Sequence, residues 1–323
     1  MPQAPAKNAI LYLAQTRTPT HVGCGQGLDD IDLPLKRNVV TGLPEWPGSG
    51  IKGAWRDRAP ARWGVDAAQV NALFGATRET DAKALHAGVL MPQDAHLLAL
   101  PVASLCGGWA WATSVTVLQR LRREATALGL PGLPELPAPL TDDEGQALRA
   151  AYMPAQCPLA LPASEVRAVV LGDLQLPTKT DAHQTALCAE WGQWLARHAY
   201  AGDDDKDWRL HMAQRLVIVD DSSFEHLARV GTEVRHRVSL GEGRVADEHA
   251  LWREECLPAD TVMWGLVAAQ RVPQLALLES EALALVRPCS LQMGGKASVG
   301  YGWVDFWPLP ASTGGAGALR GQP

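Results

Sequence analysis

Near its C-terminus the sequence reads Leu291-Gln292-Met293-Gly294-Gly295-Lys296-Ala297-Ser298-Val299-Gly300-Tyr301-Gly302-Trp303-Val304-Asp305-Phe306. Two short strand-like segments, 291–293 and 303–306, flank a loop that is rich in glycine. Glycine supplies the positive φ that a tight β-turn needs. The exposed N–H groups of such a loop can also hold a phosphate. The stretch therefore predicts a turn between the last two strands, and both roles can hold together.

A second glycine-rich loop follows the first strand that the sequence predicts, at 10–16. The loop has glycines at 23, 25 and 27, and glycines at alternate positions fit neither a helix nor a packed strand. It continues through the acidic stretch Asp29-Asp30-Ile31-Asp32 to Pro34. A turn at 47–50 then precedes a predicted helix from Ile51, with Ser49 or Gly50 near its cap.

Composition excludes several classes of protein. The chain has 323 residues, a formal net charge of −6 and 47% hydrophobic residues, which is too apolar for a disordered chain. No apolar run approaches the roughly 18 residues that span a bilayer, and the N-terminus does not resemble a secretory signal, so we expect a cytoplasmic protein without membrane contact. The six cysteines are widely spaced, which excludes a zinc ribbon and predicts free thiols. P-loop, His-Glu-x-x-His and Gly-x-Ser-x-Gly motifs are absent from the sequence.

Strand and helix patterns alternate with long insertions, which predicts an α+β fold with an antiparallel sheet and helices on one side. Residues 234–240 alternate apolar and polar side chains before a glycine turn at 241–243, which predicts a β-hairpin. Residues 129–140 contain four prolines and are predicted to be irregular. Thr141-Asp142-Asp143-Glu144 has the capping-box pattern that opens a short helix.

The glycine-rich and hairpin segments, taken in chain order, resemble one known family. The segments are 18–25, 31–37, 41–44, 47–53, 73–75, 232–237, 250–258 and 291–302. They are similar to motifs of the RAMP superfamily of CRISPR-associated proteins, and specifically to the repeated backbone subunit of the type III-B effector, the Cmr complex. The resemblance covers roughly residues 10–305 and is weakest over 129–215.

The resemblance implies a single domain over 1–323 with a ferredoxin-like (RRM-type) core and inserted fingers and thumb segments. It places a catalytic loop and guide-binding segment at about 17–60, a variable insertion at about 129–215, a thumb hairpin at about 230–258 and a flexible tail at about 311–323. Copies of such a subunit stack along a guide RNA, and the thumb kinks the guide–target duplex at regular intervals. An aspartate in the first long loop then cleaves the target RNA beside each kink.

Asp32 matches that aspartate. Because an aspartate carboxyl titrates near pH ~4, it is a poor general base at neutral pH. We therefore expect Asp32 to be a ligand of a divalent metal, Mg²⁺ or a similar ion, that activates a bound water or hydroxyl. Asp29 and Asp30 leave open which of the three acids is essential, and His21 is a further candidate for a catalytic or supporting role.

The resemblance also implies contacts with the RNA backbone. The helix start supplies N–H groups and positive charge, and the C-terminal loop forms a second cradle. Two arginines of the hairpin alternate with valines, so they share one face that suits phosphate. The predicted RNA-binding residues are Ser49, Gly50, Lys52, Arg56, Arg235, Arg237, Gly294, Gly295, Lys296, Ser298 and Gly300. Most of the twelve Trp residues are expected in the core or at subunit contacts.

The expected partners are guide RNA, complementary target RNA, further copies of this chain and the other Cmr subunits, among them the large polymerase-like and the small helical subunit. Two alternatives stay open. One is a structural RNA-binding backbone subunit without catalytic activity. The other is a metal-independent, guide-processing endoribonuclease of the same superfamily that uses His and Lys as acid and base.

Overall fold

The computed structural model describes residues 8–27, 30–76, 86–142, 144–162, 167–240 and 246–309. The predicted tail at 311–323 and Asp29 lie outside these ranges. The strands are β1 (Ala9–Thr16), β2 (Glu45–Trp46), β3 (Leu90–Pro92), β4 (Ala95–Ser104), β5 (Gly108–Ser114), β6 (Ala151–Tyr152), β7 (Ala168–Leu171), β8 (Leu174–Pro177), β9 (Leu216–Val219), β10 (Glu233–Leu240), β11 (Ala246–Cys256), β12 (Val262–Ala269), β13 (Cys289–Gln292) and β14 (Trp303–Leu309). The helices are α1 (Gly48–Trp63), α2 (Ala67–Phe74), α3 (Val115–Ala127), α4 (Ala182–Ala199), α5 (Lys206–Arg215), α6 (Asp221–Val230) and α7 (Glu279–Ala284).

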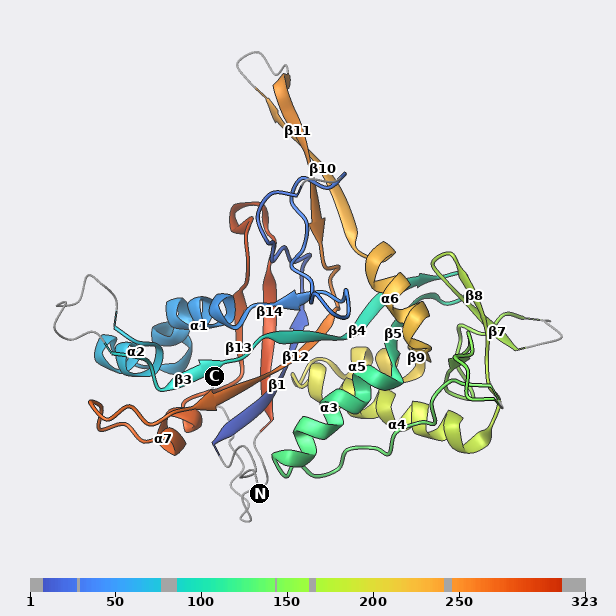
Figure 1. Cartoon of the computed structure of the whole chain (residues 1–323), viewed down its shortest axis with the longest axis horizontal. Helices are drawn as coiled ribbons and strands as arrows, with labels where there is room; N and C mark the ends of the chain where they lie inside the picture. The colour runs from blue at the N-terminus through green and yellow to red at the C-terminus, as the bar shows by residue number, and fades with distance from the viewer. Residues whose placement is uncertain are drawn as a thin grey trace.

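The centre of the molecule is one large sheet with the strand order β13-β14-β1-β12-β4-β5-β9-β6 (Figure 1). Strand β1 lies between β14 and β12 and pairs antiparallel with both. Its segment Leu11–Ala14 is fully buried, because neighbours cover both of its edges and helices cover the sheet. This position explains why the strand predicted at 10–16 is almost continuously apolar.

Aromatic side chains fill the space between α1 and the sheet. The ring of Trp55 on α1 lies 5.4 Å from that of Tyr12 on β1 and 5.6 Å from that of Phe306 on β14. Seven of the twelve Trp residues are buried, as the composition predicted. They are Trp46, Trp55, Trp63, Trp111, Trp191, Trp194 and Trp264.

The expectation of an antiparallel sheet with helices on one side is wrong in two respects. Strand β5 pairs parallel with β9, so the sheet is mixed. Helices also lie on both faces, because successive strand residues point to opposite sides. Gly265 lies opposite Tyr12 on the face that α1 covers, whereas Trp264 lines a pocket with Arg120 of α3 on the other face.

Strands β10 and β11 form the predicted hairpin, which projects away from the sheet (Figure 1). They pair antiparallel from Glu233 opposite Cys256 to Leu240 opposite Ala246, with an irregularity after Val238. The glycine turn predicted at 241–243 lies outside the described residues. The hairpin therefore forms a two-stranded sheet of its own, joined to the large sheet through α6 and β12.

The region at 129–215 contains β6, β7, β8, α4 and α5 after an irregular proline-rich segment, as predicted for 129–140. The helix predicted from Thr141 does not form. Instead, the Asp142 carboxylate accepts hydrogen bonds from the backbone N–H groups of Glu144 (3.0 Å) and Gln146 (2.8 Å), which closes a turn. All six cysteines are free thiols. None of the helices in the described ranges is long and apolar enough to cross a membrane.

Candidate functional site

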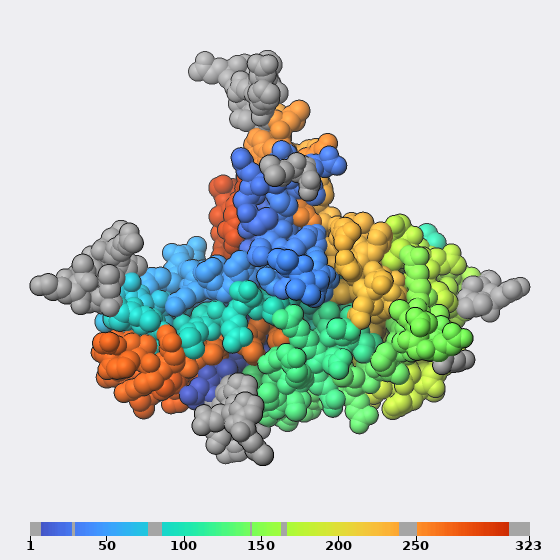
Figure 2. Space-filling view, viewed as in Figure 1, coloured from blue at the N-terminus to red at the C-terminus, as the bar shows by residue number. Residues whose placement is uncertain are grey.

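We call the base of the hairpin, residues 232–237 and 252–257, the neck. The loop after β1 and the C-terminal glycine-rich loop, which are distant from it in sequence, meet there. The loop after β1 pairs with the neck through reciprocal backbone hydrogen bonds of 2.9 Å between Thr20 and Leu257. The same loop binds the C-terminal glycine-rich loop, because Gly295 N–H donates to the His21 carbonyl oxygen at 3.0 Å. Figure 2 shows these blue, orange and red segments converging on one face of the molecule.

The segment that contains Asp32 lies along the outer edge of β11. Leu33 N–H donates to the Arg253 carbonyl oxygen, and Glu255 N–H donates to the Leu33 carbonyl oxygen, both at 3.0 Å. The Oδ2 atom of Asp32 accepts a hydrogen bond from the Arg253 backbone N–H at 2.7 Å. Arg253 in turn donates from Nη1 to the Asp30 carbonyl oxygen at 3.1 Å. One oxygen of Asp32 is thereby fixed, while the side chain stays exposed to solvent.

Asp32 borders two hollows between this loop and the hairpin. The first has a volume of about 390 Å³ and is lined by Asp30, Asp32, His236, Leu251, Trp252 and Arg253. The second has a volume of about 460 Å³ and is lined by Gln26, Gly27, Asp32, Leu33, Leu251, Trp252 and Lys296. The predicted catalytic loop, the predicted thumb and the glycine-rich loop thus contribute to one cleft around Asp32.

A buried carboxylate holds this arrangement together. Glu255 is 3% exposed and accepts hydrogen bonds from the Leu35 N–H and the Thr232 hydroxyl, each at 2.8 Å, and from the Arg37 guanidinium. The Nδ1–H of His21 donates to the Glu255 carbonyl oxygen at 2.7 Å. Because His21 is 8% exposed and lines neither hollow, its geometry favours a structural contact over a catalytic one.

On one face of the neck, basic side chains surround the Tyr301 ring and the Glu254 carboxylate. The guanidinium groups of Arg235 and Arg237 both lie over the Tyr301 ring, at 5.1 and 5.0 Å from its centroid, and both donate to its hydroxyl. The alternation of the strand therefore places both arginines on one face, as predicted. Lys296 Nζ lies 2.7 Å from the carboxylate of Glu254, which is buried.

Glu254 links the hairpin to the glycine-rich loop. Its carboxylate also accepts hydrogen bonds from Trp252 Nε1 at 2.6 Å and from Arg237 Nε at 3.4 Å. Burial alone would raise its pKa, but the hydrogen bonds from Lys296 and Trp252 outweigh burial and hold the pKa below its ordinary value. Lys296 adopts a left-handed backbone conformation, with φ of 67°. Gly294, Gly295, Ser298 and Gly300 are exposed in the same loop.

The start of α1 forms a separate predicted patch. The helix begins at Gly48, whose N–H donates to the Asp94 carboxylate at 2.7 Å, whereas the N-cap residue Pro47 contributes no side-chain hydrogen bond. Ser49 and Gly50 are exposed in its first turn. Burial, followed by the nearby charge of Arg56, lowers the pKa of Lys52.

The Arg56 guanidinium is engaged within the fold. It donates to the Asn71 side chain at 2.7 Å and to the Gly75 carbonyl oxygen, so it holds α2 against α1. Among the described residues, α1 makes no hydrogen bond or ion pair with the neck, so the two predicted RNA-binding patches are distinct.

The donor set around Asp32 bears on the expected metal. Across the described ranges, no three or more His, Cys, Asp or Glu side chains gather as a metal cluster. Asp30 and Asp32 nevertheless line the same hollow. Mg²⁺ commonly takes one or two protein carboxylates and completes its shell with water and phosphate oxygens. Two exposed carboxylates in a cleft therefore fit an ion whose remaining ligands come from RNA.

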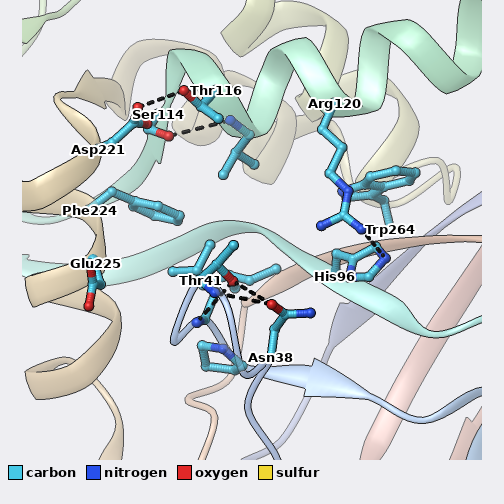
Figure 3. Close-up of a pocket in the computed structure, with 14 residues that line it drawn as sticks. Asn38, Thr41, His96, Ser114, Thr116, Arg120, Asp221, Phe224, Glu225 and Trp264 are labelled. Atoms are coloured by element: carbon cyan, nitrogen blue, oxygen red, sulfur yellow. Dashed lines mark hydrogen bonds between the residues drawn. The ribbon is translucent and has the colours of Figure 1, made fainter.

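A further pocket of about 250 Å³ lies between α3, α6, β4 and the loop at 38–44 that precedes β2 (Figure 3). At one end Arg120 donates to His96 Nε2 at 3.1 Å, and the His96 ring lies 5.4 Å from that of Trp264. Burial, with Arg120 as a second cause, lowers the pKa of His96. Sequence reasoning included segment 41–44 among the family motifs but predicted no pocket here, because its lining residues come from separate elements that only the fold brings together.

The residues missed at the neck itself are Glu255, Arg253 and His236. Each belongs to the predicted hairpin, so its pattern of alternating side chains was the available signal. The pattern gives the face of the strand on which a side chain lies. The pattern does not predict which loop of the chain packs against the edge of β11.

The chain matches the RAMP superfamily over residues 13–305. It is 27% identical over 304 residues to the CRISPR system Cmr endoribonuclease Cmr4 of Pyrococcus furiosus, covering 92% of this chain and 94% of that protein. Its fold is similar to the crystal structure of oligomeric Cmr4 from Pyrococcus furiosus, with a TM-score of 0.68, 23% identity and coverage of 94% and 99% of the two chains. It is also similar to a chain of the type III-B Cmr-beta complex bound to cognate target RNA, with a TM-score of 0.65, 16% identity and coverage of 93% and 97%. Since the family match extends over nearly the whole chain, this protein belongs to the RAMP superfamily.

Proposed function

We propose that this chain is a guide-RNA-binding filament subunit of a type III-B CRISPR effector, and that it cleaves complementary target RNA at regular intervals. The observation that carries the proposal is the placement of Asp32. Its carboxylate is anchored by the Arg253 N–H at 2.7 Å and borders both hollows at the neck. The similarity to an endoribonuclease of the Cmr system over 92% of the chain supports the same activity.

The proposed architecture is a ferredoxin-like core with the β10–β11 hairpin as its thumb. Support comes from the antiparallel strand order β14-β1-β12-β4 within the larger sheet. Helix α1 lies between β1 and β4 in sequence, and α7 lies between β12 and β14. In this order each helix connects two strands that flank a third, which supports the proposed β-α-β-β-α-β core.

The residues at the neck suit the reaction. Cleavage of RNA by its own 2′-hydroxyl needs the attacking oxygen, the phosphorus and the leaving oxygen in line. A projecting hairpin can displace one nucleotide from the duplex and so provide that geometry. Arg235, Arg237 and Lys296 would bind the flanking phosphates, and Arg253 fixes the position of the Asp32 carboxylate.

Asp32, with Asp30 beside it in the hollow, would hold the divalent ion together with phosphate oxygens of the target. When bound, such an ion lowers the pKa of a coordinated water or hydroxyl and offsets the charge on the phosphate. The roles of the chain itself are to hold the two carboxylates in the cleft and to keep the phosphate within their reach.

The test is a reconstituted complex with a guide and a labelled complementary RNA, in Mg²⁺ or in chelator. Wild type is compared with Asp32→Ala, and with Asp204→Ala as a matched control, since Asp204 is exposed between α4 and α5 and lines neither hollow. We expect periodic cuts that disappear in chelator and in Asp32→Ala, whereas target binding persists and Asp204→Ala cleaves like wild type.

Other outcomes identify the alternatives. Target binding without any cut in wild type would establish a structural backbone subunit. Cuts in the guide precursor that resist chelator would establish a guide-processing enzyme. Unchanged target cleavage by Asp32→Ala would transfer the essential role to Asp29, Asp30 or His21.

A further inference from the structure

The hairpin presents a second chemical group to the cleft around Asp32. Because strand residues alternate, His236 lies on the face opposite to Arg235 and Arg237, which contact Tyr301. His236 is exposed and lines the hollow that also contains Asp30 and Asp32. Within the described part of the chain, its imidazole forms no hydrogen bond with another side chain or backbone group.

The pairing of the strands fixes how far His236 is from Asp32. His236 on β10 lies directly opposite Arg253 on β11. The Arg253 N–H, at the other edge of β11, is bound to Asp32. Neighbouring strands are about 4.8 Å apart, so the backbones at positions 236 and 32 are separated by about 10 Å. This separation leaves room for one phosphodiester group between the two side chains.

Three other basic groups near the cleft are already engaged. The Arg253 guanidinium donates to the Asp30 carbonyl oxygen. His21 donates to the Glu255 carbonyl oxygen and is buried. Lys296 is paired with the buried carboxylate of Glu254. An imidazole is the side chain whose ordinary titration range allows it to give a proton at neutral pH. His236 is therefore the residue at the cleft that combines this chemistry with access to a bound phosphate.

We propose that His236 is the general acid of target cleavage. The proposal rests on the proposed function, since it needs RNA to be cut in this cleft. The 2′-oxygen forms a bond to phosphorus and its proton passes to a water molecule in the cleft. The bond between phosphorus and the 5′-oxygen breaks, and protonated His236 gives its proton to that oxygen. The products are a 2′,3′-cyclic phosphate and a 5′-hydroxyl, and His236 regains a proton from solvent.

A change of leaving group tests this role directly. In the assembled complex, the target RNA is replaced by one in which sulfur bridges the scissile phosphorus and the 5′-carbon. A thiolate leaves without protonation, so it does not need a general acid. The variants are His236→Gln and, as a matched control, His183→Gln, because His183 is exposed on α4 and outside the cleft.

With ordinary RNA we expect His236→Gln to cleave about 10²-fold more slowly than wild type at unchanged target affinity, in the range that general acids contribute. With the sulfur-bridged RNA we expect His236→Gln and wild type to cleave within about threefold of each other, because the acid is no longer required. His183→Gln should match wild type on both substrates.

Two results would overturn the proposal: equal rates for His236→Gln and wild type on ordinary RNA, or the same slowing on both substrates, which would indicate a binding or structural role. Asp32→Ala serves as the separate control of the proposed function. It should stay slow on both substrates, and if it cleaves ordinary RNA normally, the proposed function fails whatever His236 does.

Discussion

Replacement of Glu255 by alanine should destabilise the whole neck. This carboxylate is 3% exposed and receives the Leu35 N–H, the Thr232 hydroxyl and the Arg37 guanidinium. From its place on β11, it therefore connects the loop after β1 to Thr232, which directly precedes β10. Its removal leaves the Leu35 N–H without an acceptor and Arg37 without its counter-ion, although Arg37 also donates to the carbonyl oxygens of Gly42 and Ala228.

The magnitude follows from these three partners. Breaking a buried, hydrogen-bonded ion pair from one side costs about 3–5 kcal/mol of unfolding free energy. For a chain of this length, about 2 °C of Tm is lost per kcal/mol, so Glu255→Ala should lower Tm by about 6–10 °C. Glu255→Gln keeps one oxygen for the Leu35 N–H and loses the charge, so it should cost about 1–3 kcal/mol. Glu233→Ala, which removes a partly exposed partner of Arg235, should cost no more than about 1 kcal/mol.

The assay is denaturant and thermal unfolding of the purified chain, with Arg37→Ala and the double variant completing a thermodynamic cycle. Direct contact between Arg37 and Glu255 predicts a coupling free energy above about 1 kcal/mol. If Glu255→Ala lowers Tm no more than Glu233→Ala does, or if the cycle shows no coupling, the carboxylate does not hold the loop to the hairpin and the reasoning is refuted.

Further predictions test the C-terminal glycine-rich loop, the pocket that contains His96, and the arginines of the hairpin. Gly294 has φ of 73° and an added Cβ would overlap the His21 carbonyl oxygen, so Gly294→Ala should cost about 2–4 kcal/mol, while Gly295→Ala, with ordinary contacts, should change Tm little. Burial lowers the pKa of His96 in the folded chain, so as pH falls the unfolded chain binds the proton first, and stability should decline below about pH 6.5. His96→Gln should make that decline in Tm shallower, and a pH profile identical to that of wild type would contradict this. Tyr301→Phe removes the hydroxyl that accepts from Arg235 and Arg237, so it should lower stability by about 1 kcal/mol and weaken target binding measured by filter retention, and unchanged values of both would show that the hydroxyl does not order the arginines.

Local patterns predicted the elements whose partners are close in sequence. The hairpin follows from alternation over 234–240, and the placement of Arg235 and Arg237 on one face needs only the two-residue period of a strand. Strand β1 follows from its apolar run. The parallel pairing of β5 with β9 could not be predicted in this way. Leu216–Val219 is buried on both faces, and its four apolar residues do not indicate which strand pairs with it.

The capping pattern at 141–144 fails for a related reason. A capping box favours a helix only where an apolar face then packs onto the core. The residues after Asp142 are mostly exposed, so the carboxylate closes a local turn. At the candidate site, the sequence predicted a catalytic role for Asp32 through its resemblance to a family motif, and that role stays a prediction. The anchors Arg253 and Glu255 are more than 200 residues away along the chain, and their contacts with the loop arise only from tertiary packing.

The carboxylates near the neck are of two kinds, those in ion pairs with basic side chains and those without such a partner among the described residues. Glu233 and Glu254 are paired with Arg235, Arg237 and Lys296, so they position cations that would face phosphate. Asp30 and Asp32 form no ion pair within the described residues, and the Asp32 carboxylate is bound by a neutral backbone N–H. Two unneutralised acids beside the cations that we propose as phosphate ligands would repel RNA and reduce its affinity. A subunit that only bound RNA would gain from their removal, whereas the metal-assisted cleavage that we propose requires them. The placement of Asp32 in the cleft therefore supports the proposal of cleavage over one of binding alone.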